Sequence, residues 1–429
     1  MQNQLKEVST NTLFREINNP ELTIIDVRPI EAYNGWPLYN EHRGGHIKGA
    51  KSLPRKWSKY LDWLDIVRSK NISKEHDIIL YGYTEKDAVQ VAELMMQAGY
   101  KNVKVYHHFI DEWSVNNKYP MEKLARYQQL VYPAWVNDIV ERKKKQLISE
   151  NEYVICHTHY GFEEDYSGGH IPGAISLNTN WLESTETWNR HSPEELKRTL
   201  EQSGIKHDST VILYGRFAHP NNDDPYPGQS AGHLAAMRCA AIMMYAGVND
   251  VRILNGGLTA WLDEGYPLTQ TETKPVPVQE FGKEIPGNPE IFIDTAKARE
   301  LLAAENGDLI SVRSWDEFIG KVSGYHYIEK KGRIPGAVFG NCGSDAYHME
   351  NYRNLDHTML EYHEVLDQWQ ELGISTNKYL AFYCGTGWRG SEAFMNAYLM
   401  GLPNISVYDG GWFEWSNDEN NPIETGTPK

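Results

Sequence analysis

The chain carries the same ordered set of short motifs three times. One motif recurs as Gly45-His-Ile-Lys-Gly-Ala50, Gly169-His-Ile-Pro-Gly-Ala174 and Gly332-Arg-Ile-Pro-Gly-Ala337. In each copy it lies between two short apolar runs, and a tryptophan close to a proline follows further along. Motifs that recur in a fixed order indicate one structural unit repeated in tandem. This repeat limits the fold more than any other feature, because each copy is expected to fold in the same way.

Within each copy, short runs rich in β-branched and aromatic residues alternate with helical stretches such as Asp87–Gln97, Glu194–Gln202 and Tyr362–Leu372. This alternation predicts an α/β fold, in which a parallel sheet is covered by helices on both faces. Functional groups in such folds gather at the carboxyl ends of the strands. We therefore look for candidate site residues directly after the apolar runs.

The repeats predict three domains, which we place at residues 1–125, 126–272 and 273–429. A chain of 429 residues has the length of about three average domains. The stretch Thr269–Pro289 contains four prolines and few aliphatic residues, and this composition is typical of an extended linker. The join between the first two copies, near Met121–Gln129, is shorter and less distinct.

The net charge of −16 argues against a surface for nucleic acid or an anionic membrane. The four cysteines lie far apart without a C-x-x-C pair, so neither a zinc site nor a disulfide framework is predicted, and a reducing compartment is favoured. No run approaches the length of a transmembrane helix or a signal peptide. We expect a cytoplasmic protein, or a periplasmic one if a signal peptide has been removed from this sequence.

The third copy has a cysteine at the end of its central apolar run. Tyr379–Tyr383 has the length and composition of a strand, Cys384 follows it, and Ser391–Met400 is predicted to be a helix that Gly401 closes. The residues between cysteine and helix include Gly385, Thr386, Gly387, Trp388 and Arg389. Glycines let successive backbone N–H groups converge on one point, which favours an anion there.

A cysteine at a helix N-terminus beside a cation favours the thiolate form, so we expect Cys384 to be a nucleophile. When the three copies are aligned, Cys384 falls opposite Gly82 and Gly215. The first two copies therefore lack a nucleophile, and only the third is expected to catalyse a reaction.

The segment Tyr383-Cys-Gly-Thr-Gly-Trp-Arg389, with Gly332-Arg-Ile-Pro-Gly-Ala337 before it and Val407-Tyr-Asp-Gly-Gly-Trp412 after it, resembles the rhodanese family of sulfurtransferases. Because the other two copies carry related motifs, the resemblance covers nearly the whole chain. It implies three tandem rhodanese-like domains, each a parallel sheet flanked by helices. The first two would be inactive and the third catalytic.

The resemblance also implies a two-step sulfur transfer. Cys384 would take the outer sulfur of thiosulfate or a related donor as a persulfide, and a thiol, cyanide or a sulfur-accepting protein would then remove it. No metal or organic cofactor is expected. 3-Mercaptopyruvate is an alternative donor, because the loop departs from the patterns of both thiosulfate-preferring and mercaptopyruvate-preferring relatives. A non-catalytic rhodanese-repeat scaffold that binds a protein partner is an alternative of another class.

Other residues carry more than one interpretation. Arg389 would steady the loop or add to its positive field. Arg313 follows a strand where the family has an anion-binding arginine, and would hold substrate or form a structural ion pair. Arg333 replaces a histidine of the other copies, and would add a cation near the loop or lie on its rim. Arg216 and His170 of the second copy would reach across the cleft, although packing in a loop is the simpler role for His170.

Within the loop, Thr386 would hydrogen-bond the sulfur or the substrate, and Trp388 would shield the persulfide or pack on a helix. Cys156 and Cys239 are expected to be small core residues, whereas a sulfur relay through Cys342 stays open. Cysteine phosphatases also close a cysteine loop with arginine, but with five intervening residues. This chain has four, from Gly385 to Trp388, which favours sulfur over phosphate.

Overall fold

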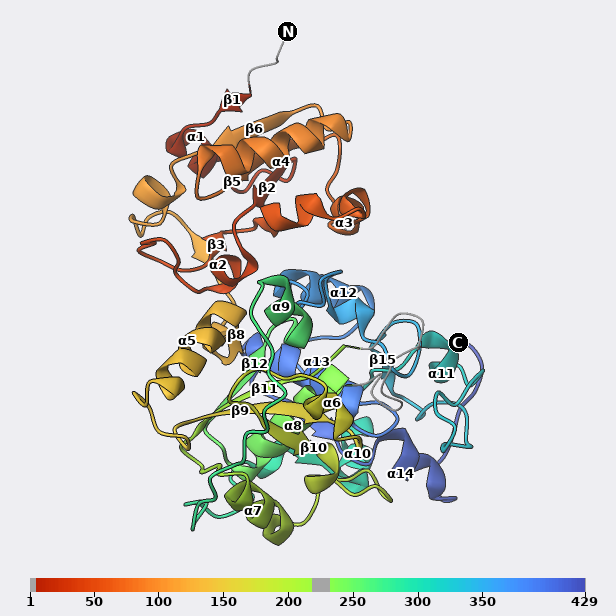
Figure 1. The fold of residues 1–429 in the computed structure, drawn as a ribbon. Coiled ribbons are helices and arrows are strands. Elements are labelled where there is room, and N and C mark those ends of the chain that lie inside the picture. Colours follow the sequence, from red (N-terminus) through yellow and green to blue (C-terminus); the bar gives the residue numbers. More distant parts are fainter. Residues whose placement is uncertain (1–4, 218–231, 429) are drawn as a thin grey trace. The chain divides into compact units, whose positions relative to one another are not determined.

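The computed structural model describes residues 5–217 and 232–428 (Figure 1). The chain separates into two compact units, Met1–Gln128 and Gln129–Lys429. The first unit contains the first copy of the repeat, and the second unit contains the other two. Among the described residues, no helix has both the length and the apolar composition that crossing a bilayer requires.

The first unit is built on a five-stranded parallel sheet in the order β1-β6-β5-β2-β4. Its central strands are buried on both faces, and Figure 1 shows α4 lying along β5 and β6. The side chain of Thr84 begins α4 by accepting a hydrogen bond from the backbone N–H of Asp87. The strands are β1 (Lys6–Glu7), β2 (Leu22–Asp26), β4 (Lys51–Ser52), β5 (Asp77–Tyr81) and β6 (Val103–Tyr106). The helices are α1 (Thr10–Glu16), α2 (Ile30–Asn34), α3 (Trp63–Ser69) and α4 (Glu85–Gln97).

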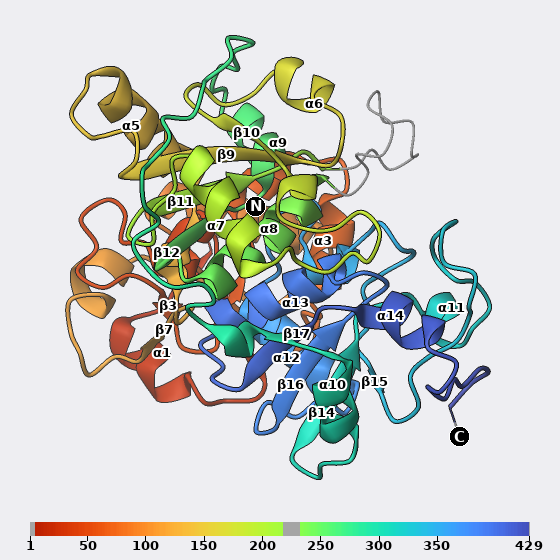
Figure 2. The same ribbon diagram turned by 90° about the horizontal axis from the view of Figure 1, so that it is seen from below.

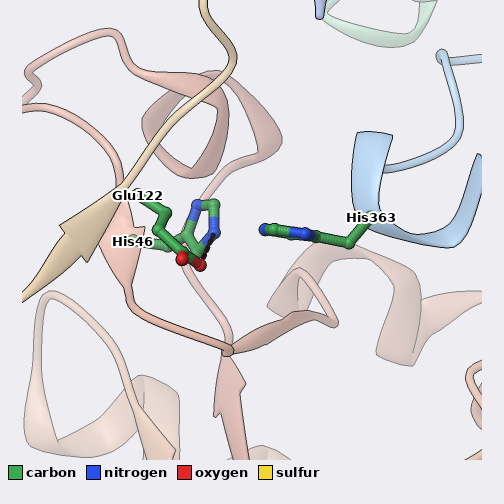
Figure 3. Close-up of side chains that lie close together, drawn as sticks. All are labelled: His46, Glu122 and His363. Carbon is green, nitrogen blue, oxygen red and sulfur yellow. Dashed lines mark ion pairs between the residues drawn. The ribbon is translucent and has the colours of Figure 1, made fainter. Parts of the chain in front are cut away.

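A short antiparallel pair, β3 (His46–Ile47) with β7 (Met121–Glu122), lies beside this sheet. The His46 ring stacks on Tyr33 with 3.7 Å between ring centroids, and its Nδ1 lies 2.8 Å from the carbonyl oxygen of Tyr33. Its Nε2 lies 4.0 Å from Glu122 Oε2, and Figure 3 shows these two side chains facing each other. The histidine of the first repeated motif is therefore fixed within its own unit.

The second copy has its five strands in the order β8-β12-β11-β9-β10, all parallel. The strands are β8 (Leu130–Val131), β9 (Tyr153–His159), β10 (Ile175–Asn178), β11 (Thr210–Tyr214) and β12 (Asp250–Leu254). The helices are α5 (Pro133–Lys144), α6 (Glu164–Ser167), α7 (Pro193–Gln202), α8 (Gly232–Ala246) and α9 (Gly257–Asp263).

The third copy repeats this order as β13-β17-β16-β14-β15. The strands are β13 (Phe292–Ile293), β14 (Gly307–Ser311), β15 (Val338–Phe339), β16 (Tyr379–Tyr383) and β17 (Ile405–Tyr408). The helices are α10 (Thr295–Leu302), α11 (Trp315–Phe318), α12 (Tyr362–Glu371), α13 (Trp388–Leu399) and α14 (Gly411–Asn417). The three five-stranded sheets of the described residues thus share one strand order, as the sequence repeat predicts.

The helices α8 and α13 are corresponding elements of the second and third copies, and they pack against each other (Figures 1 and 2). The last residues of the strands before these helices, Tyr214 and Tyr383, are fully buried. Helix α13 is buried on almost every side because β16, β17 and α8 surround it. The residues that follow β16 therefore lie at the junction of the two copies.

The proline-rich segment 269–288 contains no helix and no multi-residue strand, as expected of an extended connection. It is nevertheless attached to the second copy. The N–H of Val278 donates to the Glu201 carbonyl oxygen, and Phe281 is fully buried. This attachment restricts the freedom of the linker that joins the second and third copies.

Candidate active site

Cys384 is the first residue after β16, and Gly82 and Gly215 take the same place after β5 and β11. The loop is shorter than the sequence indicated, since α13 begins at Trp388 rather than at Ser391. The reason is the backbone of Gly387, which is left-handed with φ +88° and turns the chain into the helix early. Arg389 is therefore a residue of the first helical turn.

Backbone contacts hold the loop closed. The N–H of Trp412 donates to the Cys384 carbonyl oxygen at 2.8 Å, and the N–H of Phe413 donates to that of Gly385 at 2.9 Å. Both donors belong to the first turn of α14. Gly385 lies directly under Tyr325, where a Cβ atom would come within 2.3 Å of the ring carbon Cε2. Only glycine fits there, which explains the residue that follows the cysteine.

Arg389 is fully buried. Its side chain binds Glu317 and does not extend into the space above the loop. Its Nη1 and Nη2 donate to the two Glu317 carboxylate oxygens at 2.8 and 2.9 Å, and Nη1 also lies 3.1 Å from Cys342 Sγ. Arg313 donates from Nε to the same carboxylate at 3.2 Å. Burial by itself would raise the pKa of Glu317, but Arg389 and Arg313 outweigh it and lower the pKa to about 2.

The pairing explains a departure from the repeat. In the first copy, Asp26 binds Arg28 two residues later. In the third copy Ser311 replaces this aspartate, and Glu317 supplies the carboxylate from α11 one turn after Arg313. One buried carboxylate therefore pairs with both arginines that the sequence placed near the sulfur.

A cavity of about 650 Å³ opens over the loop. Thr386 and Trp388 line it, and six further lining residues of the third copy include Tyr325, Tyr327 and Tyr347. The second copy contributes five lining residues, among them Tyr160, Trp188 and Glu186. Among the described residues the lining contains no arginine and no lysine.

The aromatic rings of the cavity form a continuous wall. Trp188 stacks on Tyr327 with 5.0 Å between ring centroids, Tyr160 stacks on Trp188 at 5.8 Å, and Tyr160 meets Trp388 edge to face at 5.8 Å. Tyr327 and Thr386 line the same cavity. Burial raises the pKa of both Tyr325 and Tyr327, so these phenols stay protonated.

The predicted site residues are thus only partly brought together. Gly385, Thr386, Gly387 and Trp388 follow Cys384 directly, and Thr386 and Trp388 line the cavity. Arg313 and Arg389 instead meet at Glu317. Arg216 pairs with the buried Asp165 at 2.8 Å. His170 stacks on Tyr166 with 3.7 Å between centroids, as His46 stacks on Tyr33. Neither Arg216 nor His170 lines the cavity.

The remaining candidates are placed as follows. Arg333 binds the C-terminal segment through Glu424 and the carbonyl oxygen of Gly426. Cys342 is buried, and burial raises its pKa to about 12 although Arg389 opposes the shift. Burial also raises the pKa of Cys156 to about 12, and that of Cys239 strongly. These thiols are therefore poor nucleophiles.

The second copy reaches the loop through residues that the sequence did not single out, namely Tyr160, Trp188, Glu183 and Arg238. Trp188 stands in the turn-rich run Thr185-Glu-Thr-Trp188, and its left-handed backbone (φ +61°) is rare for a bulky residue. A tryptophan in a polar turn was the one sequence feature that could have pointed to this residue, and it is a weak indication. Arg238 lies within an apolar helix, and a single arginine in such a helix is the sequence feature that could have pointed to it.

The rhodanese-like domain family matches the chain over residues 9–116, 141–264 and 294–418. The chain belongs to the rhodanese family. The family and the fold expected from the sequence are therefore confirmed. Thiosulfate sulfurtransferase YnjE of Escherichia coli is 40% identical over 406 residues, which cover 94% of this chain and 88% of that protein.

Solved structures of EanB have a higher sequence identity to this rhodanese than YnjE has. One, in complex with ergothioneine, is 53% identical with a TM-score of 0.95, and covers 99% of this chain and 100% of that chain. A structure of the anaerobic ergothioneine biosynthesis enzyme from Chlorobium limicola, in complex with its natural substrate trimethyl histidine, has the same values. A further EanB structure carries a cysteine persulfide and is 53% identical with a TM-score of 0.94, covering 99% of this chain and 100% of that chain. The chain is a sulfurtransferase that works through a cysteine persulfide, as the sequence predicted.

Proposed function

We propose that Cys384 carries the persulfide and passes its outer sulfur to the imidazole ring of trimethyl histidine, which yields ergothioneine. The observation that carries this proposal is the aromatic cavity over the Cys384 loop, whose described lining has no arginine and no lysine. The bound molecules of the 53% identical structures support it. The proposal narrows the predicted acceptor from a general thiol or cyanide to an aromatic carbon.

The cavity suits a small betaine in size, and its wall suits the quaternary ammonium group of such a molecule. Its volume of about 650 Å³ lies within the usual range for small-molecule sites. Faces of tryptophan and tyrosine attract quaternary ammonium groups, and Trp188 and Tyr327 present stacked rings in the wall. Glu186 adds a carboxylate to the same lining. A dianion such as thiosulfate would meet no arginine or lysine side chain there.

The transfer is balanced without an external oxidant. The persulfide Cys384–S–SH reacts with the ring C–H to give ring C–SH and the Cys384 thiol. The S–S bond and the C–H bond break, a C–S bond forms, and the proton from carbon is matched by the proton that the leaving thiolate gains. The sulfane sulfur is the oxidant, so no cofactor is needed for this step.

The surrounding residues take distinct roles in this proposal. The backbone N–H groups of Gly385, Thr386 and Gly387 would face the negative charge of the persulfide, in the manner of an oxyanion hole. The protonated phenol of Tyr327 would offer a hydrogen-bond donor to a ring nitrogen, whereas the Tyr325 hydroxyl donates to the carbonyl oxygen of Ala346 at 2.9 Å. Trp388 would cover the sulfur against water. Arg389 and Arg313 would act on the loop indirectly, through Glu317.

A second candidate is transfer of sulfur from thiosulfate to a thiol or cyanide. The 40% identity to YnjE over 94% of the chain favours it. In either case we propose a small-molecule sulfur donor for loading Cys384, with 3-mercaptopyruvate as the alternative to thiosulfate and a sulfur-accepting protein as a further partner. We also propose that the domains at residues 1–125 and 126–272 are non-catalytic, because glycine stands where residues 273–429 have Cys384. A cytoplasmic location stays a prediction.

The two candidates are separated by one experiment. The reduced protein, its Cys384→Ser variant and a Cys156→Ser control are incubated with thiosulfate, 3-mercaptopyruvate or polysulfide, and intact masses are measured. A gain of about 32 Da that depends on Cys384 identifies the persulfide and its donor. The loaded protein is then mixed with trimethyl histidine or with cyanide.

We expect ergothioneine to appear by liquid chromatography and mass spectrometry, with loss of the added sulfur from Cys384. Discharge by cyanide without any reaction with trimethyl histidine would favour the second candidate. Absence of a Cys384-dependent mass gain with every donor would contradict both candidates and leave a partner-binding scaffold.

A further inference from the structure

Arg238 is a fully buried arginine of the second copy that lies against the active loop of the third. It belongs to α8, the helix that packs on α13. Most of its neighbours on α8 are alanine, methionine and other apolar residues. Burying a guanidinium costs folding free energy unless the group is paired. The contacts of Arg238 therefore indicate its role.

Arg238 connects three elements around the loop. Its Nε donates to Glu183 Oε2 at 2.7 Å, and its Nη2 donates to Asp409 Oδ1 at 2.6 Å and to the carbonyl oxygen of Trp188 at 2.9 Å. Asp409 follows β17 of the third copy, whereas Glu183 and Trp188 belong to the second. A planar guanidinium can satisfy acceptors in such divergent directions, and an ammonium cannot do so from one position.

Glu183 extends this connection to the active loop. Its other oxygen, Oε1, accepts a hydrogen bond from Trp388 Nε1 at 2.7 Å. The indole of Trp388 lines the cavity. The chain from Arg238 through Glu183 therefore sets the orientation of the aromatic ring beside Cys384, and its contact with the Trp188 carbonyl holds a second ring of the same wall.

The remaining nitrogen of Arg238 points at the loop itself. A Cβ atom on Gly387 would lie 2.9 Å from Nη1 of Arg238. Gly387 is the left-handed residue that starts α13. Nη1 is buried and has no hydrogen-bond partner among the described residues. Glycine is thus required at position 387 for two independent reasons. Its φ is +88°, and this guanidinium approaches it closely.

We infer that Arg238 is the positioning residue by which the catalytically silent second copy holds the active loop of the third. It orients Trp388 through Glu183, holds Trp188 by its carbonyl oxygen, and packs on Gly387. This inference rests on the proposed role of Cys384, but it does not depend on which acceptor receives the sulfur. It gives the second copy a definite role in the reaction without a nucleophile of its own.

Arg238→Lys tests the inference, because it keeps the charge and removes the fork of donors. Arg190→Met is the matched control. Arg190 pairs with the other oxygen of Asp409 and lies over the rings of Tyr245 and Phe292. It contributes to the same junction through these side-chain contacts, whereas its pairing with Glu183 is a backbone β-bridge that the substitution retains.

Two rates are measured in single-turnover experiments: formation of the Cys384 persulfide and its discharge to trimethyl histidine or cyanide. The melting temperature and tryptophan fluorescence are recorded beside them. Misplacement of reacting groups by about 1 Å can cost about 100-fold in rate. We expect Arg238→Lys to slow discharge by roughly 10-fold to 100-fold, with Arg190→Met staying within about twofold of wild type.

A double-mutant cycle with Trp388→Phe, which removes the indole N–H, distinguishes positioning from general stability. If Arg238 acts through Glu183 on Trp388, the two effects are not additive, and the double variant is little slower than Arg238→Lys alone. Additive effects, equal slowing by Arg190→Met, or wild-type discharge by a folded Arg238→Lys protein would each overturn the inference.

Glu183→Gln provides a second variant in case Arg238→Lys does not fold. The amide keeps the shape of Glu183 but removes the charged acceptor, so we expect slower discharge and an altered Trp388 fluorescence signal. Wild-type rates in this variant would also overturn the inference. If the wild-type protein itself forms no persulfide, the proposed function fails instead, so the two failures are distinguishable.

Discussion

Arg389 binds Glu317 through both of its terminal nitrogens, at 2.8 and 2.9 Å, and the pair is almost completely buried. Arg313 shares the same carboxylate. The arginine that ends the active loop is therefore fixed behind the loop rather than offered to substrate. One carboxylate thus fixes the start of α13, and the described lining of the cavity has no arginine and no lysine.

Glu317→Gln is expected to destabilise the protein strongly. It leaves two buried guanidiniums without a counter-charge, and breaking a buried ion pair of this kind typically costs about 3–5 kcal/mol. Equilibrium unfolding in urea measures the change. Glu300→Gln is the control, because Glu300 pairs with Lys297 on the surface and should have no measurable effect. A Glu317→Gln protein as stable as wild type would contradict the structural role of this carboxylate.

Acid should weaken the protein partly through Glu317. Its pKa is about 2 in the folded protein, against an ordinary value of 4.5. The stabilisation from this group is fully present above pH 4.5 and is lost as the pH falls from 4.5 towards 2, because the unfolded chain binds the proton first. Unfolding free energies measured across this window should fall less steeply in Glu317→Gln than in wild type. Equal slopes would exclude a large contribution from Glu317.

Glu183 should contribute to stability with the opposite dependence on pH. Burial raises its pKa from 4.5 to about 7, more than Arg238 lowers it. The folded protein therefore holds this proton at a pH where the unfolded chain has released it, and the contribution to stability falls as the pH rises from 4.5 to 7. Melting temperatures of Glu183→Gln across this range should decline less than those of wild type. A steeper decline in the variant would contradict the raised pKa.

Gly385→Ala should abolish sulfur transfer. The added methyl group would lie 2.3 Å from Cε2 of the buried Tyr325, so the ring or the loop must shift beside Cys384. Overpacking of this kind costs typically about 1–3 kcal/mol in stability. Persulfide formation is followed by intact mass. Gly373→Ala is the control, because Gly373 has no atom within 4 Å of its Cβ position, and its φ of +79° makes the backbone strain of alanine its only cost. Full activity in Gly385→Ala would show that the loop tolerates displacement.

Trp188→Ala is expected to weaken binding of the acceptor without preventing persulfide formation. Loss of one aromatic face from a quaternary ammonium site costs about 0.5–2 kcal/mol, which is roughly a 2-fold to 30-fold rise in KM. Steady-state formation of ergothioneine gives KM, and intact mass gives the loading of Cys384. Trp181→Ala is the control, since Trp181 is exposed and lines a different groove. An unchanged KM would place the ammonium group elsewhere.

Local patterns in the sequence predict most of the fold. The threefold motif order, the apolar runs and the helical periodicity depend on neighbours along the chain, and the sheets with a common strand order follow from them. The position of Cys384 was predictable for the same reason, because the ends of a strand and a helix are local features. The start of α13 was placed three residues late, since the left-handed turn at Gly387 does not follow from helical propensity.

The charges around the loop were not predictable in this way. Arg389, Arg313 and Arg216 are cations in the sequence, but the structure pairs them with Glu317 and Asp165. Pairing depends on which carboxylates the fold brings within about 3 Å, and Glu317 is 72 residues from Arg389 in the chain. The arginines could be identified from the sequence, but the carboxylates that pair with them could not.

The sequence by itself determined that the chain is a triple rhodanese with one nucleophile, because repetition and strand-to-helix order are written in neighbouring residues. Only the tertiary structure decided what surrounds that nucleophile. Tyr160, Trp188 and Arg238 reach it from the second copy through contacts that span 139 to 228 residues of chain, such as Arg238 with Asp409 at a separation of 171. Contacts of this range are set by the packing of α8 on α13, and no local pattern encodes them.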